Sequence, residues 1–204
     1  MIGTIIKLAV LYELGLTVRG TIERHNYYNE ARYYCDQVGK PLLRIGMRRL
    51  PWEPPNGDVT IDIDPEVLNL EGGVLGDERQ MPFVDKQFGV AFNEHTLEHL
   101  YSPEDVEQAV NECVRVADKA VFLVPSPYSI AGNLLNPTHH LRLWFDQLNN
   151  RILVEENKYN IGLGFNFGST FDYKNISPAG IGQVLVAENI SPKIITSGHG
   201  FIVV

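Results

Sequence analysis

The sequence predicts an α/β fold built on a mostly parallel sheet. Short apolar runs alternate with helical segments between residues 41 and 124, and this alternation is typical of parallel strands joined by right-handed crossovers. The run Ala120–Val124 is continuously apolar and rich in β-branched residues, as expected for a strand that is covered on both faces. The chain has 204 residues, of which 44% are hydrophobic, so it can form one domain with a sizeable core.

Residues 4–38 are predicted to be helical. Apolar side chains recur there at helical spacing, and Gly39, Lys40 and Pro41 end the segment. Lys7 and Glu13 interrupt its apolar start, which is therefore too short and too charged for a membrane-spanning helix. We expect the helix to pack on the domain or on a partner rather than to contact a membrane.

Five apolar runs beyond residue 40 are predicted to be strands or strand ends: Leu42–Ile45, Val59–Pro65 with a closing turn, Val74–Asp77, Phe88–Phe92 and Ala120–Val124. Residues 47–57 contain three prolines, so they cannot form a crossover helix. Helices are predicted at 94–100 and 103–117, with Ser102 as the cap of the second, and another near His139. Antiparallel strands are expected after residue 151. The chain thus divides into an N-terminal helical segment, residues 1–40, and an α/β domain, residues 41–204.

Charge and cysteine content narrow the class of protein. The net charge is −8, which argues against a general nucleic-acid-binding surface because phosphate binding needs clustered Lys and Arg. Neither Cys35 nor Cys113 belongs to a C-x-x-C pair, so no disulfide framework is indicated. We interpret both as reduced thiols and expect a cytoplasmic location.

Acidic and glycine residues fall where the predicted strands end. Gly46 follows the first strand, Asp62 and Asp64 lie at the second, and Asp77 follows the third. Ligands of open parallel sheets bind at these carboxyl ends. A carboxylate after the second strand can accept hydrogen bonds from both ribose hydroxyls of a nucleoside, and one after the third can accept a hydrogen bond from an adenine amino group.

Several short motifs carry a family resemblance, and they occur in the family's order: Thr60–Leu68, Gly76–Phe83, Asp85–Phe92, Leu97–Leu100, Arg115-Val116 and His139–Asp146. Together they resemble the class I S-adenosylmethionine-dependent methyltransferases. The resemblance implies a Rossmann-like parallel sheet of the methyltransferase type, with helices on both faces. It also implies S-adenosylmethionine as cofactor and direct methyl transfer to a small-molecule or protein acceptor.

The resemblance also implies roles for single residues. Gly46 would let the backbone approach the cofactor, Asp62 would hold the ribose and Asp77 would contact the adenine. Met81 would pack on the adenine face. Glu94 and His95 are the candidates for catalysis beside the substrate opening.

The first motif departs from the family pattern D-x-G-x-G-x-G. Arg44 stands in place of an acid, Arg48 in place of a second glycine, and Gly89 in place of an aspartate in the fourth strand. A second interpretation therefore stays open: a catalytically inactive methyltransferase fold that serves as a binding or assembly subunit through its N-terminal helix. An open cavity beside the strand-end acids would favour the enzyme, and arginines that fill the cavity would favour the inactive domain.

His95-Thr-Leu-Glu98-His99 also matches H-x-x-E-H, a zinc-binding pattern. His95 and His99 would lie one helical turn apart and could share a metal ion. No third ligand stands at that pattern's spacing, and the methyltransferase motif accounts for the same residues. The sequence therefore predicts no metal site.

Overall fold

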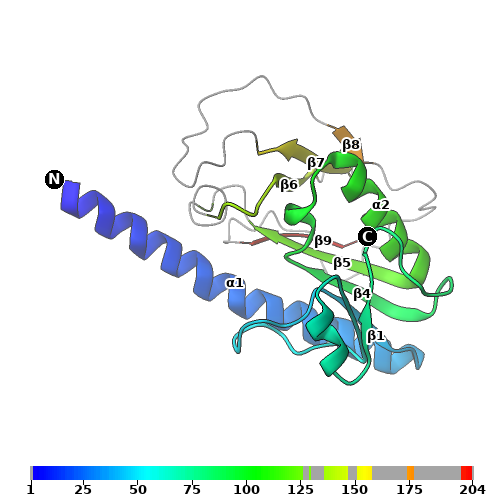
Figure 1. Ribbon diagram of the computed structural model, residues 1–204. Coiled ribbons are helices and arrows are strands. Elements are labelled where there is room, and N and C mark those ends of the chain that lie inside the picture. Colours follow the sequence, from blue (N-terminus) through cyan, green and yellow to red (C-terminus); the bar gives the residue numbers. More distant parts are fainter. Residues whose placement is uncertain are drawn as a thin grey trace.

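The computed structural model describes residues 2–125, 129, 136–146, 151–157, 174–176 and 199–203. Figure 1 shows the elements along the chain. In order they are α1 (Ile2–Val38), β1 (Leu42–Ile45), β2 (Val59–Asp62), the 3₁₀ turn η1 (Pro65–Asn69), β3 (Gly73–Leu75), β4 (Phe88–Glu94), the 3₁₀ turn η2 (Leu97–His99), α2 (Pro103–Val116), β5 (Ala117–Pro125), β6 (Leu141–Asp146), β7 (Arg151–Glu156), β8 (Lys174–Ile176) and β9 (His199–Val203).

The central sheet has the strand order β3-β2-β1-β4-β5-β9. Strands β1 to β5 pair in parallel, and β9 pairs antiparallel to β5. The chain winds outward from β1 to β3 and then returns to place β4 on the other side of β1. The predicted Rossmann-like α/β class is thus confirmed. The direction in which successive strands are added to the sheet reverses between β1 and β4. This reversal is the position at which such sheets bind ligands.

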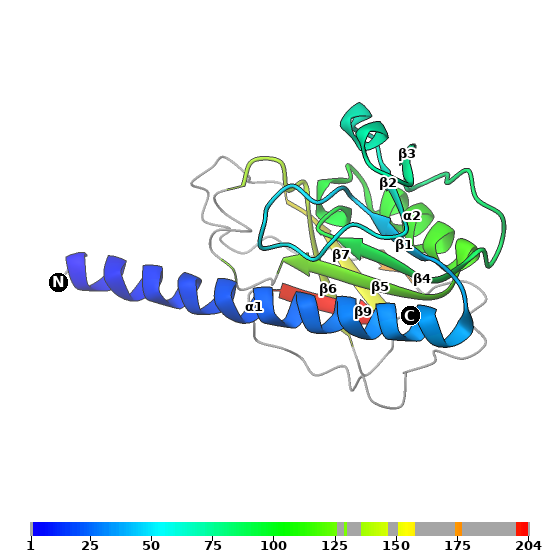
Figure 2. The same cartoon turned by 90° about the horizontal axis from the view of Figure 1, so that it is seen from below.

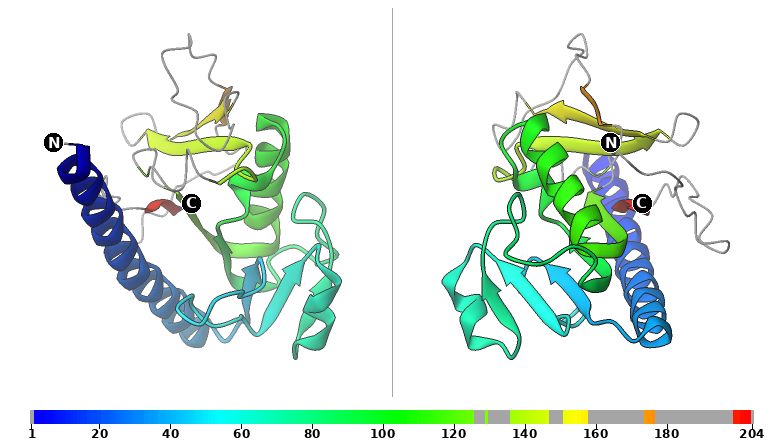
Figure 3. Two further views of the ribbon diagram at one scale, coloured as in Figure 1. Left: turned by 60° about the vertical axis from the view of Figure 1, so that its left-hand side comes forward. Right: turned by 90° about the vertical axis from the view of Figure 1, so that its right-hand side faces the viewer.

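The two long helices lie on opposite faces of this sheet (Figure 3). The second half of α1 packs Tyr28, Ala31 and Cys35 against β1, β4 and β5, as Figure 2 shows from below. Helix α2 covers the other face with Val106, Ala109, Val110, Cys113 and Val116. The small antiparallel sheet β6-β7-β8 joins the core on the α2 side.

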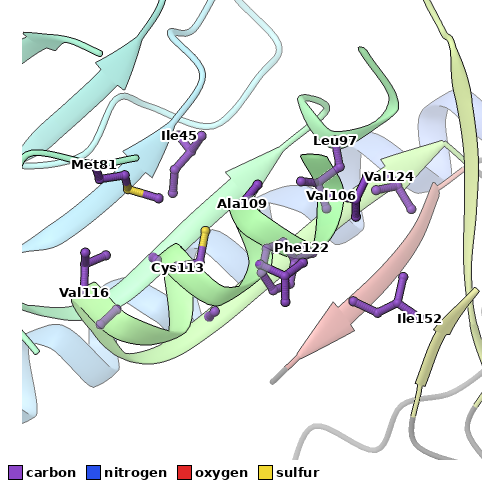
Figure 4. Close-up of a cluster of buried hydrophobic side chains, with 14 of the residues drawn as sticks. Ile45, Met81, Leu97, Val106, Ala109, Cys113, Val116, Phe122, Val124 and Ile152 are labelled. Carbon is purple, nitrogen blue, oxygen red and sulfur yellow. The ribbon is translucent and has the colours of Figure 1, made fainter. Parts of the chain in front are cut away.

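Helix α2 begins as the sequence predicts. Its N-cap, Ser102, accepts a hydrogen bond from the Asp105 backbone N–H at 3.1 Å, and Pro103 occupies the first turn. A serine oxygen satisfies a backbone donor that has no partner inside the helix, and proline has no N–H to lose there. The buried face of this helix includes Val106, Ala109, Cys113 and Val116 (Figure 4).

Two predicted helices differ in the structure. The predicted helix at 94–100 is reduced to the short turn η2. Strand β4 continues to Glu94, and His95 adopts a φ of 55° that ends the strand in a turn. The helix predicted near His139 is wrong, because β6 runs from Leu141 to Asp146 and pairs with β7. Leu141 and Leu143 alternate into the core, which is the period of a strand.

The first half of α1 extends beyond the rest of the described chain (Figure 1). Apolar side chains such as Ile5, Leu8 and Leu11 are exposed along it. Within the described residues, no helix combines the length and the apolar character that a bilayer crossing requires. The division into segments 1–40 and 41–204 stays a prediction.

The packing of α1 explains one departure from the methyltransferase pattern. Gly89 of β4 lies directly under the end of α1, where a Cβ atom would be 2.9 Å from Cys35 Sγ and 3.2 Å from Cys35 Cα. The family's aspartate would not fit in this space. The glycine therefore follows from the long helix that covers this face of the sheet.

We expect Gly89→Ala to lower the free energy of unfolding by about 1–3 kcal/mol, because the added methyl group overpacks a fixed helix–strand contact. Gly15→Ala is the matched control, since a Cβ there meets nothing within 4 Å. In an exposed helix the control should be neutral or stabilise by up to about 1 kcal/mol. Urea unfolding followed by circular dichroism measures both, and equal midpoints for the two variants would contradict this packing.

Candidate functional site

A cavity of about 1100 Å³ lies at the carboxyl ends of the parallel strands. It is lined by most of the predicted site residues: Gly46, Asp62, Asp77, Glu94 and His95. Residues of α1 and of the segment before β6 complete its wall, among them Arg24 and His139. The fold therefore brings five of the six predicted site residues to one cavity.

Met81 is the exception. It is only 4% exposed and belongs to the hydrophobic core beside Ile45 and Val116 (Figure 4). Its backbone N–H donates to Glu112 at 2.8 Å, which fixes the segment after Asp77 against α2. Met81 is not among the residues that line the cavity. The structure thus gives it a packing position instead of one against an adenine ring.

Gly46 forms the turn that ends β1. Its φ is +85°, and a Cβ atom there would lie 2.7 Å from Thr96 Cγ2. The backbone conformation and the close approach both require glycine. Its N–H donates to the Ile61 carbonyl at 3.0 Å, so the turn stays in register with β2.

Asp62 has acceptor capacity left for a ligand. Its Oδ2 accepts from the Met47 N–H at 2.7 Å and its Oδ1 accepts from the Asp64 N–H at 2.8 Å. An ionised carboxylate offers about four lone-pair sites. Two remain, which matches the two hydroxyls of a ribose.

Arg49 lies over these acids. Its guanidinium nitrogens are 2.9 Å from Asp64 Oδ2 and 3.7 Å from Asp62 Oδ2. The Glu66 backbone N–H, followed by Arg49, holds the pKa of Asp64 below its ordinary value. The Arg49 side chain is 48% exposed, and an exposed ion pair contributes only about 0.2–1 kcal/mol. Arg49 can therefore move aside for a ligand at small cost.

Asp77 is held by Arg79, which donates to Oδ1 at 3.0 Å and to Oδ2 at 2.6 Å. The same guanidinium reaches Asp105 at 2.7 Å and keeps the pKa of Asp77 below its ordinary value. Asp77 is thus ionised and fixed in direction. An adenine amino group would share it with Arg79.

Arg44, which stands in place of the family's acid, is engaged by the protein itself. It is 2% exposed and donates to the carbonyls of Gly46 at 2.9 Å, of Pro55 at 2.8 Å and of Pro54. Its remaining nitrogen lies 2.9 Å from Glu94 Oε2. Burial lowers the pKa of Arg44, and the charge of Glu94 opposes this shift. Arg44 therefore ties the proline-rich loop to β1.

Glu94 is held from two sides. Arg24 of α1 donates to its Oε1 at 3.0 Å, while Arg44 approaches its Oε2. Glu53 lies 3.9 Å from Arg44, so two arginines and two glutamates balance in charge. Both carboxylate oxygens of Glu94 are thus held by arginines of the cavity wall. The structure therefore makes Glu94 a positioning residue, and His95 remains as the predicted catalytic candidate in the cavity.

Glu78 is a cavity residue that sequence reasoning missed. Its Oε2 accepts from Asn93 Nδ2 at 2.6 Å and from Thr96 Oγ1 at 2.8 Å. Burial nevertheless raises the pKa of Glu78 to about 7. A cavity carboxyl that titrates near neutrality is suited to exchange protons. Its only sequence signal is its place next to Asp77 at the end of a strand.

Comparisons with known proteins agree with this geometry. Residues 57–124, which span β2 to β5, match the model of a methyltransferase domain family. The match confirms the resemblance to class I methyltransferases and supports S-adenosylmethionine as the cofactor. No curated protein matches the sequence.

Among solved structures, the chain is similar to a SAM-dependent methyltransferase from Archaeoglobus fulgidus. The identity is 19% over 64% of this chain and 76% of that one, with a TM-score of 0.44. A S-adenosylmethionine-dependent methyltransferase from Clostridium acetobutylicum is 12% identical over 84% of this chain and 79% of that one, with a TM-score of 0.41.

We expect Arg44→Met to lower the free energy of unfolding by about 3–5 kcal/mol, because it leaves Oε2 of buried Glu94 and three backbone carbonyls without their partner. The matched control is Arg48→Met. The Arg48 side chain donates to the loop carbonyls of Leu50 and Pro51 at the surface, so its loss should cost below about 1 kcal/mol. Chemical denaturation compares the two, and similar losses would show that Arg44 does not hold the loop.

Proposed function

We propose that the protein is an S-adenosylmethionine-dependent methyltransferase that acts on a small-molecule or protein acceptor. The observation that carries the proposal is the position of Asp62. It ends β2 beside the sheet's reversal point, lines the cavity and keeps two lone-pair sites for a ribose. The match of residues 57–124 to a methyltransferase domain family supports it.

The residues present fit the cofactor. Asp62 would accept the ribose hydroxyls, Asp77 would face the adenine, and the Gly46 turn would let the backbone approach the remaining part. The cofactor supplies an activated methyl group, so the protein needs no nucleophile of its own. The chain's contribution is to position the acceptor and to exclude water. Glu78 and His95 are the cavity groups suited to take a proton from the acceptor.

The alternative is an inactive methyltransferase fold that serves as a binding or assembly subunit. Two observations favour it. Arg49 and Arg79 form ion pairs with the strand-end acids Asp64 and Asp77, and the first half of α1 carries exposed apolar side chains. The energies favour the enzyme. The Arg49 contact is exposed and weak, whereas Arg44 is bound to buried partners along the cavity wall. The arginines thus leave space for the cofactor.

The cellular setting belongs to the same proposal. Both Cys35 and Cys113 are buried free thiols, and burial raises the pKa of Cys35 to about 11. Thiols of this kind suit a reducing compartment, so we place the protein in the cytoplasm. The net charge of −8 supports a small molecule or a protein as acceptor in preference to bulk nucleic acid.

The proposal predicts binding of S-adenosylmethionine and S-adenosylhomocysteine in calorimetric titration. Asp62→Ala should weaken binding at least about tenfold, since two hydrogen bonds to a charged acceptor are lost. Arg49→Ala should tighten binding, because Asp62 then has no competing cation. Glu66→Ala is the control: this acid also lies 3.9 Å from Arg49, but its side chain is 74% exposed.

Binding that is lost in Asp62→Ala and retained in Glu66→Ala would support the enzyme. No binding at millimolar ligand in either the native protein or Arg49→Ala would contradict the cofactor assignment and favour the inactive domain.

A further inference from the structure

Three side chains that can bind a metal ion, one glutamate and two histidines, meet at the wall of the cavity. Glu98, His99 and His139 each offer one ligand atom, and these atoms lie within 4.8 Å of one another. Glu98 is 1% exposed and His139 is 7% exposed. His99 and His139 pack edge to face, with ring centroids 4.8 Å apart. Two separate parts of the chain thus form one compact cluster.

The backbone holds these two parts together. The His140 N–H, next to His139, donates to the Glu98 carbonyl at 2.8 Å. The Asn157 N–H in turn donates to the His140 carbonyl at 2.7 Å. The cluster is therefore fixed to the small sheet and to η2 before any ligand arrives, as a metal site requires.

The hydrogen bonds of His99 leave its imidazole ready to bind a metal ion. Its Nδ1 is 3.0 Å from the Thr138 carbonyl oxygen. A carbonyl oxygen only accepts, so Nδ1 carries a proton, and in the neutral imidazole the lone pair lies on Nε2. Orientation of a histidine ligand through a backbone carbonyl is the usual arrangement around metal sites.

The Asn136 amide favours the same tautomer for His139. Asn136 Oδ1 accepts from the Thr138 N–H at 3.1 Å and from Thr138 Oγ1 at 2.7 Å. This fixes the amide so that its nitrogen faces His139 Nε2 at 2.8 Å. An amide nitrogen only donates, so Nε2 holds its lone pair toward Asn136. A metal ion would take the place of this contact.

Glu98 supplies the negative charge and an oxygen that lacks a donor. His95 Nδ1 lies 2.8 Å from Glu98 Oε1. Glu98 Oε2 is buried and accepts no hydrogen bond from any described residue. Buried carboxylate oxygens nearly always have a partner. This oxygen, in the only residue of the cluster that carries a negative charge, points to a bound cation.

We propose that Glu98, His99 and His139 bind a divalent first-row transition metal ion such as Zn²⁺ or Mn²⁺. Two imidazole nitrogens and one carboxylate suit these ions, whereas Mg²⁺ and Ca²⁺ prefer oxygen ligands alone. Three protein ligands leave coordination positions open. Because His99 and His139 also line the cavity, an oxygen of the methyl acceptor can fill such a position. This role in catalysis rests on the proposed function, but the metal site does not.

The sequence prediction of no metal site is at variance with this proposal for a clear reason. The H-x-x-E-H pattern suggests that His95 and His99 share a metal ion on one helix face. In the structure His95 sits in a turn with a φ of 55°, and its ring supports Glu98. The third ligand is His139, which only the fold brings near.

The test is calorimetric titration of the chelator-treated protein with ZnCl₂ and MnCl₂, without S-adenosylmethionine. We expect one site of micromolar or tighter affinity, with MgCl₂ at least about tenfold weaker. His99→Ala and His139→Ala should each weaken binding at least about tenfold. His140→Ala is the matched control, since this adjacent histidine stacks on Tyr101 outside the cluster and should bind as the native protein does.

Visible absorption of bound Co²⁺ gives a second readout. The native protein and His140→Ala should show the same Co²⁺ spectrum, which His99→Ala should lose. His99 is partly exposed, so this variant should fold even where His139→Ala does not, and circular dichroism checks both. Unchanged Zn²⁺ and Co²⁺ binding in His99→Ala, or no binding by the native protein, would overturn the proposal. Because no cofactor is present, this result is independent of the methyltransferase test.

Discussion

Glu94 lies at the end of β4 between two buried arginines, and this contact connects the parts of the molecule that form the cavity. Arg24 reaches it from α1, and Arg44 reaches it from β1. Arg44 also holds the carbonyls of the proline-rich loop, while Tyr28 of α1 donates to the Asn56 carbonyl in that loop at 2.8 Å. The loop therefore takes its shape from buried charges, where the methyltransferase pattern would use glycines.

The strength of each ion pair decides how the site can behave. Removing one partner from a buried pair costs about 3–5 kcal/mol, whereas an exposed pair contributes about 0.2–1 kcal/mol. Arg44 and Glu94 have 2% exposed side chains, and that of Arg49 is 48% exposed. The first pair is a fixed wall of the cavity, and Arg49 is a movable cover over Asp62. A degenerate first motif is thus compatible with cofactor binding.

Much of the fold could be predicted because its signals are local. Strand ends and breaks follow from apolar runs and prolines, and the reversal of strand order then gathers Gly46, Asp62 and Asp77. The prediction of a helix near His139 is wrong because this short pattern fits a helix as well as a strand, and only pairing with β7 decides between them. Partners distant in sequence gave no signal, as with Arg24 and Glu94.

The central claim is that Arg44 stays fixed in the cavity wall while Asp62 remains able to bind a ribose. A crystal structure of the protein with S-adenosylhomocysteine tests it most directly. The account predicts ribose hydroxyls within hydrogen-bonding distance of Asp62, Arg49 moved off this carboxylate, and Arg44 still on Glu94 and the loop carbonyls. A structure in which Arg44 has left Glu94 to enter the cavity, or in which the ligand binds away from Asp62, would contradict it.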